Sequence, residues 1–126
     1  MRKGADDDRV QTGHVLAMAR LASSFWVRAY LARLDARGIP GFVVARGDPV
    51  AGAVIVKLNT LDGSAQAFQR MPGPDGARIW STLIAGSEAE VDTALQRQRS
   101  YDPDLWVLEI EDRKGRTLLT EEGLSD

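Results

Sequence analysis

The sequence has 126 residues and a formal net charge of −2, with 44% hydrophobic and 27% charged residues. This length and balance predict one globular domain that can bury a core without disulfides or a metal ion. The absence of cysteine excludes disulfide scaffolds, cysteine-based zinc sites and a cysteine nucleophile, and the single histidine, His14, excludes metal sites built from several imidazoles.

The first 17 residues are mostly polar and show no hydrophobic period. We therefore expect a mobile tail over residues 1–17 and a single domain over residues 18–126. The longest apolar runs, such as Ala51–Val56, are too short to span a bilayer, and no signal peptide is recognisable. Together with the absence of cysteine, these features favour a cytoplasmic protein.

A helical period begins at Ser23 and continues to Arg37. Ser23 or Ser24 can cap the start of this helix, and Gly38 and Pro40 favour its end. Five apolar residues fall on one face of it: Trp26, Val27, Tyr30, Leu31 and Leu34.

After Gly38 the period changes to two, which indicates strands. The run AVIVKL, residues Ala53–Leu58, is the strongest of them, and its apolar residues on both faces favour a central strand with cover on each side. Turn motifs such as Asp62-Gly63 predict hairpins between the runs. The four expected strands are Phe42–Ala45, Ala53–Leu58, Ala65–Met71 and Ala77–Ala85.

A second helix begins with a capping box, in which Ser87 is the N-cap and Glu90 the N3 residue. Asp102-Pro103 ends this helix, because the residue before proline avoids the α region. A fifth strand is expected over Leu105–Glu111, and a short additional strand near Thr117–Leu119 remains open.

These elements predict an α+β fold: a two-layer domain with two helices and a mostly antiparallel sheet of about five strands. The expected order is α-β-β-β-β-α-β. Short turns between successive strands are the reason for expecting antiparallel pairing, since parallel strands need a longer crossover. Both helices are expected to pack on the sheet.

The fifth strand carries the most distinctive charged group of the sequence. Alternation directs Trp106 to one face and Glu109 and Glu111 to the other, with the two Cα atoms about 7 Å apart. That spacing can hold a divalent cation or serve a two-carboxylate mechanism. Charged faces are also common on exposed strands, where arginine on a neighbouring strand pairs with them. We prefer this second interpretation.

Arginine supplies thirteen of the sixteen basic residues. Arg70 and Arg78 flank the turn at Pro72–Gly76, and they approach each other if the flanking strands form a hairpin. They could bind an anion, or they could face Glu109 and Glu111; the sequence leaves both open because it does not give the strand order. The candidate ligand-binding residues are Arg70, Arg78, Glu109 and Glu111, and no catalytic or metal-binding residue is assigned.

Three segments, MARLASSFWVRAYLARLDARGIP, RGDPVAGAVIVKLNTLDG and YDPDLWVLEIED, resemble an uncharacterised family of short alphaproteobacterial proteins, a domain of unknown function. The resemblance runs from about Met18 to Leu124, and DPDLWVLEIED is its most specific part. Members of that family usually begin near Met18, so the first 17 residues depart from it. The resemblance implies a small bacterial, cytoplasmic protein and brings no activity, cofactor or catalytic residue with it.

Two functional hypotheses follow. The first is a small non-enzymatic binding or protein-interaction domain that needs no cofactor and binds an unknown protein partner or forms a homodimer. The alternative is a Mg²⁺-dependent hydrolase or nuclease-like enzyme in which Glu109 and Glu111 hold the ion with help from Asp102 or Asp112. The acidic isoelectric point argues against nucleic acid as a partner, and no segment indicates a membrane.

Overall fold

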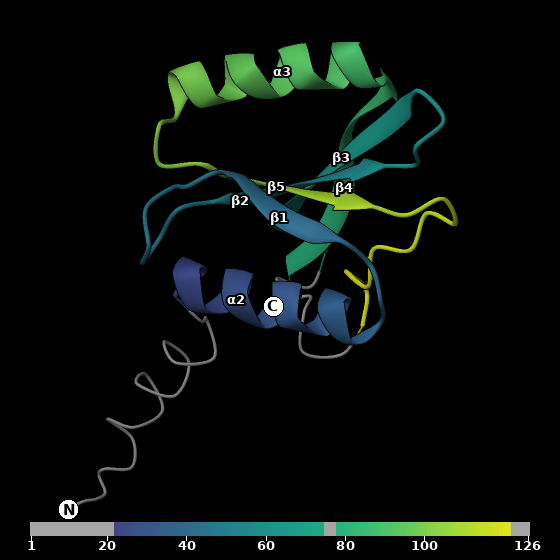
Figure 1. Ribbon diagram of the computed structural model, residues 1–126. Coiled ribbons are helices and arrows are strands. Elements are labelled where there is room, and N and C mark those ends of the chain that lie inside the picture. The colour runs from purple at the N-terminus through teal and green to yellow at the C-terminus, as the bar shows by residue number, and fades with distance from the viewer. Residues whose placement is uncertain (1–21, 75–77, 122–126) are drawn as a thin grey trace, which may run out of the picture.

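The computed structural model describes residues 22–74 and 78–121, and it shows a five-stranded sheet between two helices (Figure 1). The predicted tail, residues 1–17, lies outside the described residues. Neither helix exceeds 14 residues, and none in the described ranges is long and apolar enough to cross a bilayer. In chain order the elements are α2 (Ser23–Ala36), β1 (Gly41–Ala45), β2 (Val54–Asn59), β3 (Ser64–Pro72), β4 (Arg78–Ser87), α3 (Glu88–Tyr101) and β5 (Trp106–Glu111).

The strand order across the sheet is β1-β5-β2-β3-β4. The last strand, β5, inserts between the first two, where it runs antiparallel to β1 and parallel to β2. The other pairs are antiparallel hairpins. The α+β class, the predicted element order and the mostly antiparallel sheet are confirmed. The central parallel pair forms because α3 carries the chain back across the sheet before β5.

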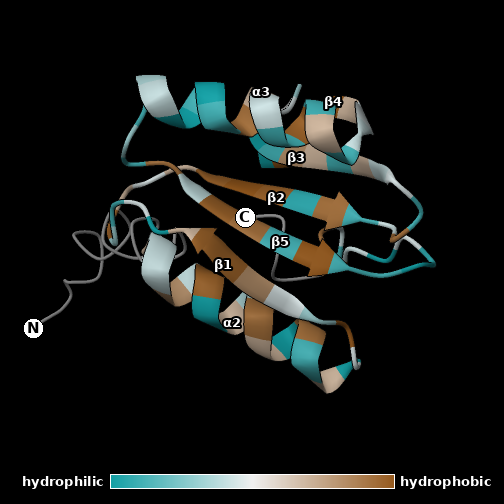
Figure 2. Ribbon diagram, turned by 45° about the horizontal axis from the view of Figure 1, so that its top comes forward, coloured by the Kyte–Doolittle hydropathy of each residue, from teal (hydrophilic) through white to brown (hydrophobic). Residues whose placement is uncertain are grey.

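The two helices cover opposite faces of the sheet, so the expectation of two layers is wrong and the domain has three (Figure 1). Alternation along β2 explains this arrangement. Val54, Val56 and Leu58 pack in the cluster beneath α2, and Ile55 packs in the cluster beneath α3. All six residues of β2 are buried. Figure 2 shows β1, β2 and β5 as predominantly hydrophobic, and β2 and β5 are covered on two faces, whereas β1 keeps exposed residues.

The helix ends agree only in part with the sequence analysis. The predicted capping box at Ser87 and Glu90 is present, with both reciprocal hydrogen bonds formed. The predicted cap of α2 is wrong: its N-cap is Ala22, with no side-chain cap. The Ser23 hydroxyl instead donates a hydrogen bond to the carbonyl oxygen of Gly52 at 2.6 Å. This bond connects the start of α2 to the loop before β2.

The loop between β1 and β2 lies directly against the start of β5. The indole N–H of Trp106 donates to the carbonyl oxygen of Asp48 at 2.7 Å, and the guanidinium of Arg46 lies 5.1 Å from the Trp106 ring centroid. A Cβ atom on Gly47 would overlap the carbonyl oxygen of Asp104 and lie 2.7 Å from the carbonyl carbon of Leu105. Glycine is therefore required at this close approach.

The chain after β5 is irregular, so the optional strand near Thr117–Leu119 does not form. Leu118 and Leu119 are nevertheless buried in the cluster beneath α2. The Tyr30 hydroxyl donates to the carbonyl oxygen of Thr117 at 2.8 Å. Asp112, which is buried, accepts two hydrogen bonds from the Arg116 guanidinium and one from its backbone N–H. These contacts complete the packing between α2 and the sheet without a further strand.

Candidate functional site

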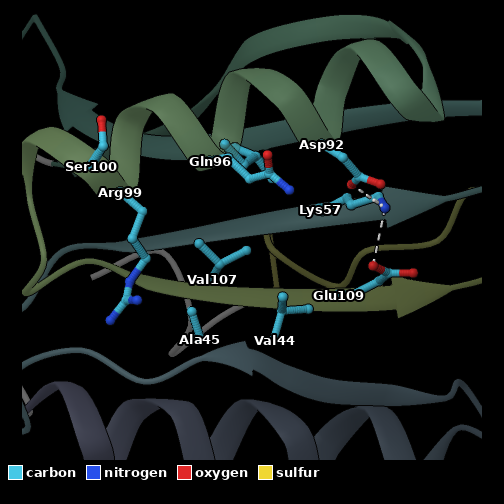
Figure 3. A pocket seen from close by; sticks show the side chains of 10 residues that line it. Val44, Ala45, Lys57, Asp92, Gln96, Arg99, Ser100, Val107 and Glu109 are labelled. Carbon is cyan, nitrogen blue, oxygen red and sulfur yellow. Dashed lines mark hydrogen bonds and ion pairs between the residues drawn. The ribbon is translucent and has the colours of Figure 1, made fainter.

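A buried lysine lies at the centre of the face covered by α3. Lys57 of β2 is only 2% exposed, and its Nζ atom contacts three carboxylates: Asp92 at 2.6 Å, Glu88 at 2.9 Å and Glu109 at 3.1 Å. Figure 3 shows Asp92 reaching down from α3 and Glu109 up from β5 toward this ammonium group. We call these four residues the Lys57 cluster.

The topology of the fold assembles the cluster. Lys57 and Glu109 are register partners on the parallel strands β2 and β5. Glu88 is the first residue of α3, and Asp92 lies one turn later, so both project from the same helix face. The Asn59 amide donates to Glu88 at 3.0 Å and more weakly to Glu109 at 3.4 Å, which holds the carboxylates from a second direction.

The cluster keeps Lys57 protonated. Burial by itself lowers the pKa of this lysine, but the hydrogen bonds to Asp92, Glu88 and Glu109 together outweigh burial and raise the pKa above its ordinary value. A lysine of this kind neither accepts a proton nor attacks a carbonyl as a free amine near neutral pH. Its three N–H donors match three carboxylate acceptors.

The cluster carries more negative than positive charge. One ammonium group faces three carboxylates, which leaves a surplus of two negative charges. The exposed fractions of the side chains are 40% for Glu88, 47% for Asp92 and 13% for Glu109. The surplus charge is therefore presented to solvent at Asp92 and Glu88, whereas Lys57 is hidden beneath them.

A groove of about 530 Å³ opens beside the cluster, between α3 and the β1 edge of the sheet. It exists because α3 packs over β3 and β4, so that β1 on the far side of β5 is left uncovered (Figure 1). The floor and walls are largely aliphatic, with Val44, Val107 and Leu95 among the lining residues. Val44 is 55% exposed, and Phe42, which precedes it on the same strand face, is 44% exposed.

The end of the groove away from the cluster is fixed by Arg99 of α3 (Figure 3). Its guanidinium donates to the carbonyl oxygens of Leu105 at 2.8 Å and Pro103 at 3.0 Å, and also to that of Arg46. These bonds join the end of α3 to the segment before β5 and to the residue after β1, which lie at the same end of the antiparallel β5–β1 pair. The acidic and basic ends of the groove are thus separated by the aliphatic floor.

Only one of the four predicted ligand-binding residues lines the groove. Glu109 does so, and it is held by Lys57. Glu111 lies on the same strand face two residues further along but is not among the lining residues. Asp112 faces the opposite core and is held by Arg116. Among residues 22–74 and 78–121, no group of three or more histidine, aspartate or glutamate side chains could hold a metal ion. The Mg²⁺ alternative stays a hypothesis.

Arg70 and Arg78 lie on the other side of the sheet. Arg70 is the register partner of Trp80, and its guanidinium lies 5.2 Å and 5.3 Å from the ring centroids of Trp26 and Trp80. Arg78 pairs with Pro72, two positions further along the same ladder. The two arginines are therefore neighbours on the α2 face, and the option that they face Glu109 and Glu111 is wrong. Their binding of an anion stays a prediction.

Sequence reasoning missed Lys57, Glu88 and Asp92 as site residues. The available signal was the lysine inside AVIVKL, since a charged residue in a strand with two apolar faces must be paired when it is buried. Glu88 and Asp92 stand at ordinary helix N-terminal positions, where acidic residues need no partner beyond the helix dipole.

The fold and site define a small α+β domain with a groove that is aliphatic along its floor and acidic at one end. Residues 21–120 match the model of a family described as protein of unknown function (DUF1491), and this chain belongs to that family. The resemblance seen in the sequence is thereby confirmed.

Solved structures of family members have the same fold. A crystal structure of a DUF1491 family protein from Caulobacter crescentus is 39% identical with a TM-score of 0.74, and covers 80% of this chain and 96% of its own. A solution structure of a protein from A. tumefaciens is 34% identical with a TM-score of 0.68, over 80% of this chain and 93% of its own. None of the curated proteins matches this chain.

Proposed function

We propose that this chain is a non-enzymatic protein-interaction domain, and that its binding site is the groove between α3 and β1. The observation that carries the proposal is the uncovered aliphatic surface of β1 beside α3. Val44 is more than half exposed, although it lies next to the buried Val107 in a preformed groove of about 530 Å³. A concave apolar surface of this kind is typical of a binding site.

The polar groups around the groove support binding rather than catalysis. Lys57 directs its Nζ at three carboxylates, and Arg99 directs its guanidinium at three backbone carbonyls. Both cations thereby fix the shape of the walls. A rigid wall lowers the entropy lost on binding, whereas a proton-transfer site needs a group that titrates near neutral pH.

The character of the exposed charge supports a protein rather than a nucleic acid as the occupant. The carboxylate of Asp92 lines the groove and that of Glu88 lies beside it in the Lys57 cluster, and both repel phosphate groups. The occupant is a segment of another protein or of a second copy of this chain. We place this interaction in the cytoplasm, in keeping with the cysteine-free composition.

The proposal is tested with three baits: the unaltered chain, Val44→Asp, and the control Val50→Asp. Val50 is 70% exposed in the loop before β2 and does not line the groove. We expect proteins recovered from a native cell lysate by the unaltered chain and by Val50→Asp to be lost with Val44→Asp. If the occupant is a second copy, light scattering instead shows a dimer that only Val44→Asp dissociates.

Recovery of the same proteins by all three baits would overturn the proposal. So would a monomeric chain that recovers no protein at all. Circular dichroism of each bait verifies that the aspartate substitutions leave the fold intact, which the exposure of both valines leads us to expect.

A further inference from the structure

We infer that the groove binds an extended segment of a partner protein in which a lysine or arginine lies two positions from an aliphatic or aromatic residue. This inference rests on the proposed function and names the chemistry of its occupant. The basic side chain is placed at the Lys57 cluster, and the apolar side chain is placed on the aliphatic floor between Val44 and Val107.

The net negative charge of the Lys57 cluster favours a basic side chain in the bound segment. Three carboxylates surround one ammonium group, so their negative charge is only partly compensated. Each carboxylate has oxygen lone pairs beyond those that Lys57 occupies, and a guanidinium can use them for charge-assisted hydrogen bonds. Because Asp92 both lines the groove and is 47% exposed, its carboxylate is the accessible partner for such a group.

The spacing of the groove selects an extended chain. Val107 and Glu109 are successive residues on one face of β5, about 7 Å apart along the strand. Side chains two positions apart in an extended peptide have the same separation and point the same way. One side chain of the segment therefore reaches Glu109 and Asp92 while its neighbour on that face covers Val107 and Val44.

The charge at the opposite end of the groove does not reverse this preference. The Nε atom and one terminal nitrogen of the Arg99 guanidinium donate hydrogen bonds to the carbonyl oxygens of Leu105, Pro103 and Arg46. These bonds hold it against the backbone, so Arg99 closes the end of the groove. An acidic side chain in the segment adds little there compared with the loss of the basic residue at the cluster.

The inference is tested by selecting peptides from a phage-displayed library of random 12-residue sequences against the full chain. Phage that also bind Val44→Asp are removed first. We expect enrichment of lysine or arginine two positions from leucine, isoleucine, valine or an aromatic residue. Enrichment of acidic or wholly apolar sequences overturns the inference, as does a selection without any enrichment.

An enriched arginine peptide is then compared with its citrulline analogue, which keeps the size and planar shape of arginine but has a carbonyl oxygen in place of one terminal nitrogen and no charge. Calorimetry is expected to show at least about tenfold weaker binding for the citrulline peptide, and a similar loss for the arginine peptide with Asp92→Asn. Asparagine still accepts a hydrogen bond from Lys57, so the fold is preserved.

The matched control is Asp35→Asn, which removes one exposed carboxylate from α2 on the opposite face of the sheet. It is expected to leave the affinity unchanged. Equal binding of the arginine and citrulline peptides overturns the inference. That result still leaves the proposed function standing if Val44→Asp abolishes binding, so the two failures are distinguishable.

Discussion

Lys57 and Glu109 are register partners on the parallel strands β2 and β5, and their charged atoms meet at 3.1 Å beneath α3. This one contact links the architecture to the site. The strands become neighbours only because the crossover through α3 brings β5 back between β1 and β2. The same helix supplies Glu88 and Asp92 to the ammonium group. The acidic end of the groove is therefore a direct product of the topology.

Replacing Lys57 with methionine is expected to lower the free energy of unfolding by about 3 kcal/mol at pH 7, because three carboxylates then face one another without their cation. Urea denaturation measures this loss.

The matched control for this substitution is Lys114→Met, which removes an exposed lysine from the turn after β5. Its effect on the free energy of unfolding is expected to stay within about 0.5 kcal/mol. Equal losses for the two variants would show that the Lys57 cluster does not stabilise the fold.

The Asp112–Arg116 pair is expected to govern part of the acid sensitivity. Hydrogen bonds from the Arg116 side chain lower the pKa of Asp112 to about 2. Because this pKa lies below the unfolded value, the stabilisation is present above about pH 4 and is lost as the pH falls toward 2.

Substituting Asp112→Asn is therefore expected to cost about 1 kcal/mol at pH 7, a modest value because Arg116 is half exposed and water screens the pair. Thermal melts between pH 7 and pH 2 should show the two proteins converging at the acid end. A constant difference across that range would contradict the assignment.

The close approach of the β1–β2 loop to β5 is expected to make Gly47 intolerant of any side chain. An alanine Cβ would overlap the Asp104 carbonyl, and the backbone must move, so Gly47→Ala is expected to cost about 3 kcal/mol or more. Gly38→Ala is the comparison: its φ of 72° is strained for alanine, but no atom lies within 4 Å of the added Cβ, so about 1 kcal/mol is expected. Denaturant titration distinguishes the two losses.

The stacking of Arg70 on Trp26 and Trp80 is expected to stabilise the α2 face. Arg70→Met keeps much of the aliphatic volume but removes the cation from both rings, and a loss of about 1 kcal/mol is expected. Tryptophan fluorescence follows the unfolding and reports the change around the rings. Arg97→Met, on the exposed surface of α3, serves as the control. No difference between the two would exclude a stabilising role for the stacking.

The sequence by itself determined the elements of this protein and the face that each one buries. Hydrophobic period and capping residues act over a few neighbouring positions, so the helix at Ser23–Ala36, the capping box at Ser87 and the two buried faces of β2 were all accessible from local pattern. Glu109 was also accessible as a candidate, because alternation along its strand places it with Glu111 on one face.

Only the tertiary structure decided which strands became neighbours and which side of the sheet each helix covered. These choices depend on contacts between residues far apart in the chain, such as Lys57 with Glu109, and no local period encodes them. For that reason Arg70 and Arg78 lie on the α2 face of the sheet, whereas Glu109 and Glu111, which the sequence left as one option for them to face, lie on the other face. For the same reason, an apparently ordinary lysine in a strand became the centre of the site.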